Sequence, residues 1–345
     1  MRHRLLTCLA SWFLLFLPVA EAQIPDFPVI GTVDFYGLRI IPESRIQALL
    51  PFKEGDSPPQ IPLDSLRTGM PTTLGVTKVE ISLVCCDNEG LSIVYVGVEE
   101  QSGNTPKYHA APAGEVTLPP EVEHSYEESM IKLMEVVQSG KGGEDRSHGH
   151  SLSEYAPLRS IQENFIAYAA HYHDLLRQVL HETANAHHRA IAAHVLGYAQ
   201  AKAGITDELA WAVQDPADEV RNNATRALAV IAEYANANPE QGIKIQPDPF
   251  IDMLNSVVWS DRNKALAVLI SLTEKRDIAI LQRLRERSLP SLIEMCRWQN
   301  LGHAASACAI LRRIVGLPDD ADPKSKTETL HGRNNCVSEM VTVVI

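Results

Sequence analysis

Asp215-Pro216-Ala217-Asp218-Glu219-Val220-Arg221 is the stretch of this sequence that says most about its architecture. It lies between two segments with the apolar periodicity of amphipathic helices and joins them as a pair. A similar junction recurs when Arg221 is aligned with Arg189, Arg262 and His303, at spacings of 32, 41 and 41 residues. Such spacings are typical of stacked units of two or three helices.

Each aligned position is followed by a small residue three places on and by a large apolar residue seven places on. Both offsets lie on one helical face, so we expect a neighbouring helix to approach at the small residue while the large one fills the space beyond. The small residues are Ala192, Ala224, Ala265 and Ser306, and the large ones are Leu196, Leu228, Leu269 and Ile310.

The stretch 215–221 resembles the inter-helix signature of HEAT repeats, and so does the looser Ser260-Asp261-Arg262-Asn263-Lys264-Ala265. The resemblance covers residues 155–316 and implies an all-α, armadillo-like superhelical solenoid, in a domain of residues 151–316. His303 departs from the arginine of the pattern, which indicates a terminal repeat. Pro290 predicts a break that gives the last unit three helices.

Residues 28–100 predict a small α+β domain with the element order β-α-α-β-β, so the chain as a whole is multidomain. Alternation around Val33 and Phe35 predicts the first strand, and two helical pieces follow. The last two strands flank Asp87-Asn88-Glu89-Gly90, which has the composition of a hairpin turn.

This small domain resembles the polypeptide-transport-associated (POTRA) domain of outer-membrane assembly and secretion proteins. The matching residues are Val33-Asp34-Phe35-Tyr36-Gly37, Pro42-Glu43-Ser44-Arg45-Ile46, Lys53-Glu54-Gly55-Asp56, Leu74-Gly75-Val76 and Val96-Gly97-Val98-Glu99-Glu100. The resemblance implies binding of a partner chain through an exposed sheet edge, and the sequence leaves open which strand forms that edge.

The chain begins with Arg2 and Arg4, an apolar run over residues 5–20 and the ending Ala20-Glu21-Ala22. This pattern is typical of a secretory signal peptide over residues 1–22, with an uncleaved anchor as the alternative. We therefore expect an exported protein of bacterial type, periplasmic or extracellular, with no stable membrane insertion after cleavage.

Charge and cysteine content restrict partners and compartment. The chain has 31 Lys and Arg residues against 43 Asp and Glu, a formal net charge of −12, which disfavours binding to nucleic acid. Cys296 and Cys308 fall in adjacent predicted helices and could meet either as a disulfide or as buried thiols. The pairing of Cys85, Cys86 and Cys336 stays open.

Three polar segments separate or follow the two domains. Residues 101–120 are proline-rich and predict a linker. Residues 121–150 predict an amphipathic helix and then a flexible connector that ends in His148 and His150. Residues 317–345 predict a polar tail.

The histidines are the strongest hint of catalysis, since eight of the 13 lie between residues 148 and 194. A zinc enzyme often carries His-Glu-x-x-His on one helix, whereas His181-Glu182 is followed by Thr-Ala-Asn-Ala. We therefore expect no catalytic residue, no metal and no cofactor. His148 and His150 could contact a partner or a metal, although solvated loop residues are the plainer interpretation.

Asp215, Asp218 and Arg221 resemble an acid-base set, but in solenoids such residues cap helices and form ladders between repeats. The sequence thus predicts a non-catalytic protein-binding scaffold or adaptor in the bacterial cell envelope, with an unidentified protein partner. The alternative is an exported metal-dependent hydrolase that uses the His-rich first repeats. The partner-binding candidates, on second helices that commonly line a solenoid's concave side, are Asn222, Asn223, Arg226, Asn263 and Lys264.

Overall fold

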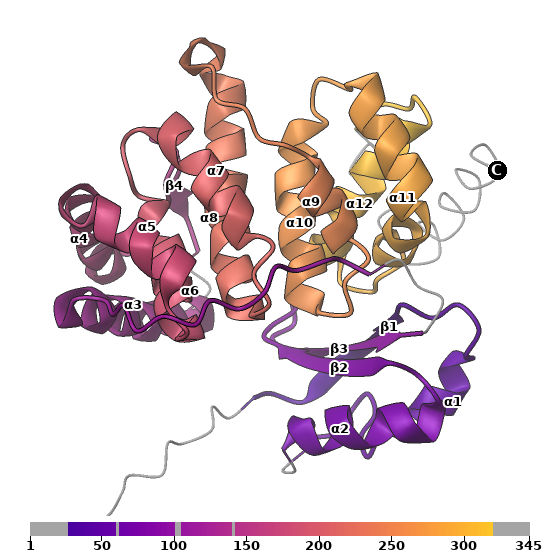
Figure 1. Cartoon of the computed structure of the whole chain (residues 1–345). Helices are drawn as coiled ribbons and strands as arrows, with labels where there is room; N and C mark the ends of the chain where they lie inside the picture. Colours follow the sequence, from indigo (N-terminus) through magenta and orange to yellow (C-terminus); the bar gives the residue numbers. More distant parts are fainter. Residues whose placement is uncertain (1–26, 60–61, 101–104, 140–141, 320–345) are drawn as a thin grey trace, which may run out of the picture.

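The computed structural model describes residues 27–59, 62–100, 105–139 and 142–319. The predicted signal peptide and all but the first residues of the predicted tail lie outside these ranges. The strands are β1 (Ile30–Tyr36), β2 (Lys78–Val84), β3 (Ser92–Glu99), β4 (Glu144–Asp145) and β5 (Leu152–Ser153). The helices are α1 (Glu43–Gln47), α2 (Leu63–Leu74), α3 (Pro120–Ser139), α4 (Ala156–His171), α5 (His173–Glu182), α6 (Ala186–Leu196), α7 (Lys202–Ala212), α8 (Asp218–Ala237), the 3-10 helix η1 (Pro239–Gln241), α9 (Asp248–Met253), α10 (Trp259–Leu272), α11 (Ile278–Cys296) and α12 (Leu301–Ile314) (Figure 1).

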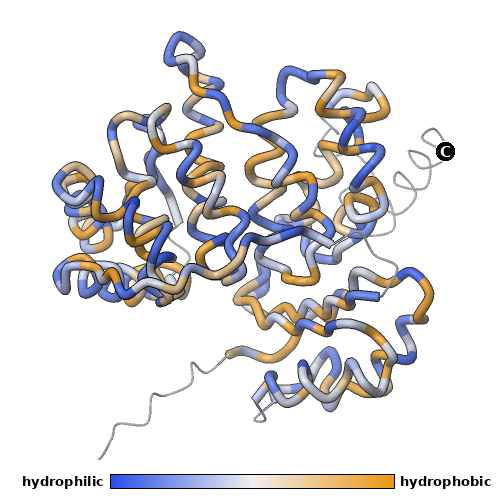
Figure 2. The backbone as a smooth tube through the Cα atoms, viewed as in Figure 1, coloured by the Kyte–Doolittle hydropathy of each residue, from blue (hydrophilic) through white to orange (hydrophobic). Residues whose placement is uncertain are grey.

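The N-terminal part is a mixed three-stranded sheet with the strand order β1-β3-β2. β3 pairs with β1 in parallel and with β2 antiparallel, so the predicted order β-α-α-β-β is confirmed and the edge strands are β1 and β2. One face of the sheet packs on α1 and α2 through a cluster that includes Ile46, Leu74, Ile81 and Val96. In Figure 2 this sheet carries much of the hydrophobic colouring of the N-terminal part.

The opposite face of the sheet is buried by the helical part. Tyr36, Ile93 and Tyr95 belong to the same core cluster as Trp298 and the helices. Every residue of β3 from Ser92 to Val98 is buried, as expected for a strand covered on both faces. The sheet therefore lies between α1–α2 on one side and the ends of the helices on the other (Figure 1).

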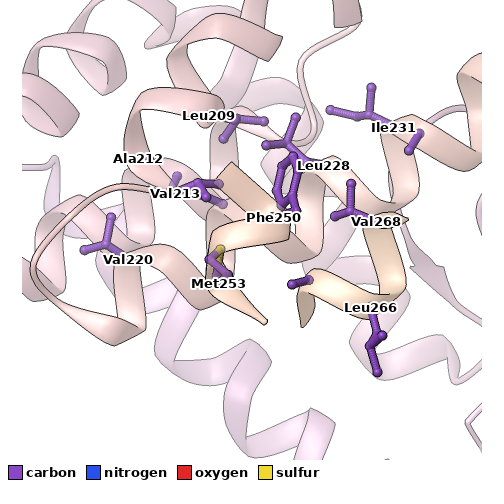
Figure 3. Close-up of a cluster of buried hydrophobic side chains, with 14 of the residues drawn as sticks. Leu209, Ala212, Val213, Val220, Leu228, Ile231, Phe250, Met253, Leu266 and Val268 are labelled. Carbon is purple, nitrogen blue, oxygen red and sulfur yellow. The ribbon is translucent and has the colours of Figure 1, made fainter. Parts of the chain in front are cut away.

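The helical part is built from a row of helices, α6, α8, α10 and α12, each in contact with the next. The helices α5, α7, α9 and α11 each pack against the row member that follows them in the chain. Seven of the eight predicted small and large positions are fully buried in this packing, among them Ala224, Ala265, Leu228 and Leu269, whereas Ser306 is half-buried. Figure 3 shows Phe250 of α9 among side chains of α7, α8 and α10.

The predicted break at Pro290 is wrong, because α11 runs unbroken through this residue. Leu284 and Leu292, on either side of it, are fully buried in the core. Tertiary packing of that face outweighs the roughly 3 kcal/mol by which proline disfavours a helix interior. Nearby, the side-chain amide of Asn255 donates to the carbonyl oxygen of Arg287 at 3.1 Å, which satisfies part of the backbone there.

The predicted linker is not free where the structure describes it, over residues 105–119. The amide of His109 donates to the carbonyl oxygen of Gln214 at 2.9 Å, and that of Gly114 donates to Glu182 at 2.7 Å. The segment runs back along the helical part to reach α3 (Figure 1). Proline disfavours helix and sheet in such a segment, but the amides of its other residues can still donate hydrogen bonds to the helical part. We call residues 105–119 the strap.

The flexible connector predicted before residue 150 is also corrected. β4 and β5 pair as a short antiparallel ribbon, with Glu144 opposite Ser153. Both strands of the ribbon contact helices: Glu144 of β4 forms an ion pair with Arg226 of α8, and the backbone amide of Ser153 of β5 donates to Oε1 of Gln162 of α4 at 2.6 Å. The polar composition of residues 142–150 therefore predicted a loop, whereas strand pairing and contacts with the helices order this segment.

Cys296 and Cys308 form a disulfide that joins α11 to α12. Cys85 and Cys86 are bonded to each other just after β2. Cys336 lies outside the described residues. Of the two interpretations that the sequence allowed for Cys296 and Cys308, the structure has the disulfide.

Candidate functional site

Buried arginines link the helix pairs. Arg189 at the start of α6 donates from Nε and Nη2 to both carboxylate oxygens of Asp215, at 2.7 and 2.9 Å. Arg221 of α8 makes the equivalent contacts with Asp261, at 2.9 and 2.8 Å. Both arginine side chains are 2% exposed and both aspartates are fully buried. We call these contacts rungs, since each spans two successive helix pairs.

The rungs share a second feature, which explains why an arginine recurs. Nη1 of Arg189 donates to the carbonyl oxygen of Thr183 at 2.9 Å, and Nη1 of Arg221 donates to that of Asp215 at 2.8 Å. Both acceptors lie six residues before the arginine. The guanidinium fork thus satisfies the turn that precedes its own helix as well as the carboxylate of the next unit.

Asp215 also accepts a hydrogen bond from the amide of Ala217 at 2.8 Å, at the entrance to α8. Asp215 and Arg221 therefore have structural contacts, as the sequence predicted. Asp215 accepts from the guanidinium of Arg189 and from a turn amide, and Arg221 donates to Asp261. Three of the roughly four acceptor sites of the Asp215 carboxylate are thereby occupied.

Asn223, a predicted partner-binding residue, makes its contacts within the chain. Its side chain is buried and its amide donates to the carbonyl oxygen of Ala190 at 2.9 Å and to the hydroxyl of Tyr126 at 3.0 Å. It therefore holds α3 and α6 onto α8. Asn222 is half-buried and its amide donates to the Asn223 side chain at 3.3 Å.

Arg226 and Lys264, from neighbouring helices of the row, are both half-buried and lie close enough for the charge of Arg226 to act on Lys264. Arg226 forms an ion pair with Glu144 of the β4–β5 ribbon. Burial, with the positive charges of Arg226 and Arg146, lowers the pKa of Lys264 to about 8, and Glu144 only partly opposes this. Asn263, also half-buried, precedes Lys264 on α10. The ribbon thus occupies part of the surface predicted to receive a partner.

His150 was expected in a solvated loop, and this is wrong: it is buried, at 5% exposure. Its Nδ1 lies 3.3 Å from Nζ of Lys202, and burial together with that charge lowers the pKa of His150 to about 4. His148 is exposed. A small hollow lined by His150, His194, Tyr198 and Arg226 lies beside them.

One group of metal-ligating side chains was missed by the sequence analysis. Glu123 and Glu127 of α3 and His187 of α6 each place a ligand atom within 4.8 Å of the others. Within the described residues, His187 is the one member of the His-rich region that belongs to such a group. The spacing of Glu123 and Glu127, four residues apart on a helix, was the signal available, but nothing in the sequence placed His187 opposite them.

A cavity of about 350 Å³ lies where the sheet meets the helices, and one of about 420 Å³ lies between residues 105–108 and the helices; Thr105, Asn255 and Arg287 line both. Several of their charged groups are paired with carboxylates. Arg262 donates to Glu294 at 3.1 Å, and Arg287 pairs with Asp248 and Asp252. Such a lining offers carboxylates and guanidiniums that neutralise one another rather than a single group aimed at a substrate.

The sheet edges differ in how far they are covered. At β1, Ile30 exchanges backbone hydrogen bonds with Gly55 and Asp56 at 2.8 and 2.9 Å, and the Val33 amide donates to Glu54 at 3.1 Å. At β2 no further strand of the described chain pairs with the outer side, where Nη2 of Arg67 contacts the Ile81 carbonyl oxygen at 2.5 Å. β2 is therefore the more open edge.

Comparison with known proteins found no matching family model, no similar curated protein and no similar solved structure. None of the helices in the described ranges combines the length and the apolarity that crossing a bilayer requires.

Proposed function

We propose that this chain is a non-catalytic protein-binding scaffold of the bacterial cell envelope, in which a POTRA-like domain is docked on a HEAT-like solenoid. The observation that carries the proposal is the open outer edge of β2 in a sheet held between two layers. Backbone groups along such an edge can pair with an extended partner segment without any particular side chain.

Packing of both sheet faces favours this mode of binding. The α1–α2 layer and the helical part fix the twist and position of β3, and β3 fixes β2 through seven paired positions. A partner strand then joins an edge whose geometry is already set, which lowers the ordering cost of binding.

The second proposed contact is the surface that carries Arg226 and Lys264. Their positive charges favour an acidic partner segment, since charge complementarity steers encounter and suppresses wrong partners. Arg226 is already paired with Glu144, so reversing its charge would also disturb the ribbon. Lys264→Gln is the cleaner test, and we expect it to weaken partner capture while the fold is retained.

A photo-crosslinking residue tests the strand-addition proposal. It would replace Lys78, exposed at the start of β2, or Thr72, exposed on α2. In an envelope extract, we expect the β2 variant of the mature chain to crosslink a discrete protein and the α2 variant to crosslink none. Equal crosslinking at both positions, or none at Lys78, would contradict the proposal.

The rival function, an exported metal-dependent hydrolase, finds one supporting feature in the Glu123–Glu127–His187 group. A hydrolase also needs a substrate cavity beside its metal. None of the three cavities described above is lined by these residues, so we interpret the group as a binding site and not as a catalytic centre.

A further inference from the structure

Glu123 and Glu127 lie one helical turn apart on α3, and both face His187 near the start of α6. The three side chains come from helices separated by the ribbon, α4 and α5. Two carboxylates and one imidazole are ligands that zinc and related divalent transition metals accept in proteins. This mixture distinguishes the group from a solvated cluster of acids.

The buried side chain of His188 lies next to the carboxylate of Glu123. The Leu118 amide donates to Nδ1 of His188 at 3.4 Å, so this nitrogen is the acceptor and Nε2 carries the proton. Nε2 lies 3.5 Å from a carboxylate oxygen of Glu123. The protonated nitrogen of His188 therefore faces Glu123 and restricts where its carboxylate points.

A further carboxylate orients His187. Nδ1 of His187 lies 3.6 Å from Oε2 of Glu219, at the start of α8. With Nδ1 facing Glu219, Nε2 is the ring nitrogen left for a cation. A carboxylate behind a ligating imidazole is the usual arrangement around protein-bound metals, because it fixes the ring and its tautomer.

The charge around the group also favours a cation. In the described residues the ion pairs of Glu123 and Glu219 are with imidazoles, not with lysine or arginine. Glu127 is exposed, so its side chain can rotate to shorten the present separation. Ligand atoms about 2 Å from a shared ion are then within reach of all three residues.

We propose that Glu123, Glu127 and His187 bind one divalent transition metal ion, with water completing its coordination, and that the ion fastens α3 to α6. Beside the site, the Tyr126 ring packs edge-on to His187, and its hydroxyl accepts from Asn223 of α8. An ion would therefore add a third attachment for a helix that joins the strap to the ribbon. The proposal does not depend on the scaffold function.

Binding of Zn²⁺ alone to the metal-free mature chain, by isothermal titration calorimetry, tests the site. We expect one equivalent to bind, and Glu127→Gln to weaken that binding by at least about tenfold. Glu128→Gln, the matched control for an exposed neighbour on the same helix, should leave it unchanged. His187→Ala should abolish binding, while His171→Ala, at an exposed histidine of α4, should not.

Circular dichroism would confirm that these exposed substitutions leave the fold intact. Co²⁺ absorption gives an independent readout, since a ligating imidazole changes the visible spectrum and His187→Ala should remove that change. Equal Zn²⁺ affinity in Glu127→Gln and Glu128→Gln, or no binding by the unmodified chain, would overturn the site. Zn²⁺ that binds without slowing hydrogen exchange in α3 would overturn the fastening role.

Discussion

All four aligned positions lie within the first four residues of their helices, but the first two and the last two contact different parts of the molecule. Arg189 and Arg221 reach forward to Asp215 and Asp261, so each joins one helix pair to the next. Their contacts are nearly identical in geometry. In this region the sequence repeat is also a repeat of interactions.

The last two positions also contact the sheet, although Arg262 keeps the forward ion pair, to Glu294 of α11, and the hydrogen bond to the carbonyl oxygen six residues before it, that of Ser256. Arg262 lies with its guanidinium carbon 4.5 Å from the centre of the Tyr36 ring, and Nδ1 of His303 lies 2.7 Å from the Tyr95 hydroxyl. Glu294 itself accepts the amide of Gly37 after β1 at 3.2 Å. The comparison shows that an aligned position stays near the start of its helix, whereas the side chains that it contacts depend on which element packs beside it.

The largest expected effect comes from breaking a rung. Asp215→Ala leaves the buried guanidinium of Arg189 without its carboxylate, and loss of one partner of a buried ion pair costs about 3–5 kcal/mol. Urea unfolding would measure the loss. Asp218→Ala, at an exposed aspartate three residues on, should change stability by only about 0.5 kcal/mol, and equal losses would contradict the rung.

Acid should weaken the sheet–helix junction through His303. Burial, with the charge of Lys264, lowers the pKa of His303 to about 4, against about 6.5 for an unfolded chain. The unfolded chain therefore binds this proton first as the pH falls, and stability is lost between about pH 6.5 and 4. The loss from this group is at most about 3 kcal/mol.

Urea unfolding across that pH range would measure the effect. His303→Gln should make the pH dependence shallower without removing it, because burial also lowers the pKa of His150 and of His194, while His171→Gln, at an exposed histidine, should leave the slope as in the unmodified chain. A slope that His303→Gln leaves unchanged would assign the acid sensitivity to other groups.

Adding one methyl group at Gly97 should weaken the packing of the sheet against the helices. A Cβ at Gly97 of β3 would lie 2.4 Å from the Val257 carbonyl oxygen and 2.6 Å from the Tyr36 ring. We expect Gly97→Ala to destabilise the chain by about 1–3 kcal/mol in thermal or urea unfolding. Gly69→Ala in α2 has open space around it and should instead stabilise, by up to about 1 kcal/mol.

The smallest effect concerns one hydrogen bond at the same junction. The Tyr36 hydroxyl donates to the Val257 carbonyl oxygen at 2.7 Å in a buried site, so Tyr36→Phe should cost about 1 kcal/mol. Tyr108→Phe removes a hydroxyl 3.3 Å from Asp261 on the partly exposed strap and should cost less. A reversed order in denaturant unfolding would contradict this ranking.

Local pattern was enough to predict the strand and helix order of the N-terminal part and the recurring arginine. It could not give the partners of Arg262 and His303, because Tyr36 and Tyr95 lie more than 200 residues away in the chain. His303 was interpreted as the mark of a terminal repeat. Its contact with Tyr95 supplies a physical reason for the departure from arginine, since a ring nitrogen faces a phenol there.

The candidate site was harder to predict for the same reason. Asn223 has the polarity of a surface residue, and its burial follows from contacts with Tyr126, 97 residues earlier, and with Ala190 of another helix. The strap was interpreted as a linker because it is rich in proline, and the ribbon as a flexible connector because it is polar and rich in glycine. The composition of these two segments disfavours helix, but the residues that hold them in place lie on or beside helices elsewhere in the chain.

Hydrogen exchange with mass spectrometry, comparing Glu294→Ala with Asp215→Ala, most directly tests the division between the two pairs of aligned positions. We expect Glu294→Ala to speed exchange in residues 36–41 and 257–262 while α6 and α8 stay protected. Asp215→Ala should speed exchange in α6 and α8 and leave β1 and β3 protected. If Glu294→Ala instead opens α6 and α8, or leaves residues 36–41 as slow as in the unmodified chain, the last aligned positions do not hold the sheet and the account is wrong.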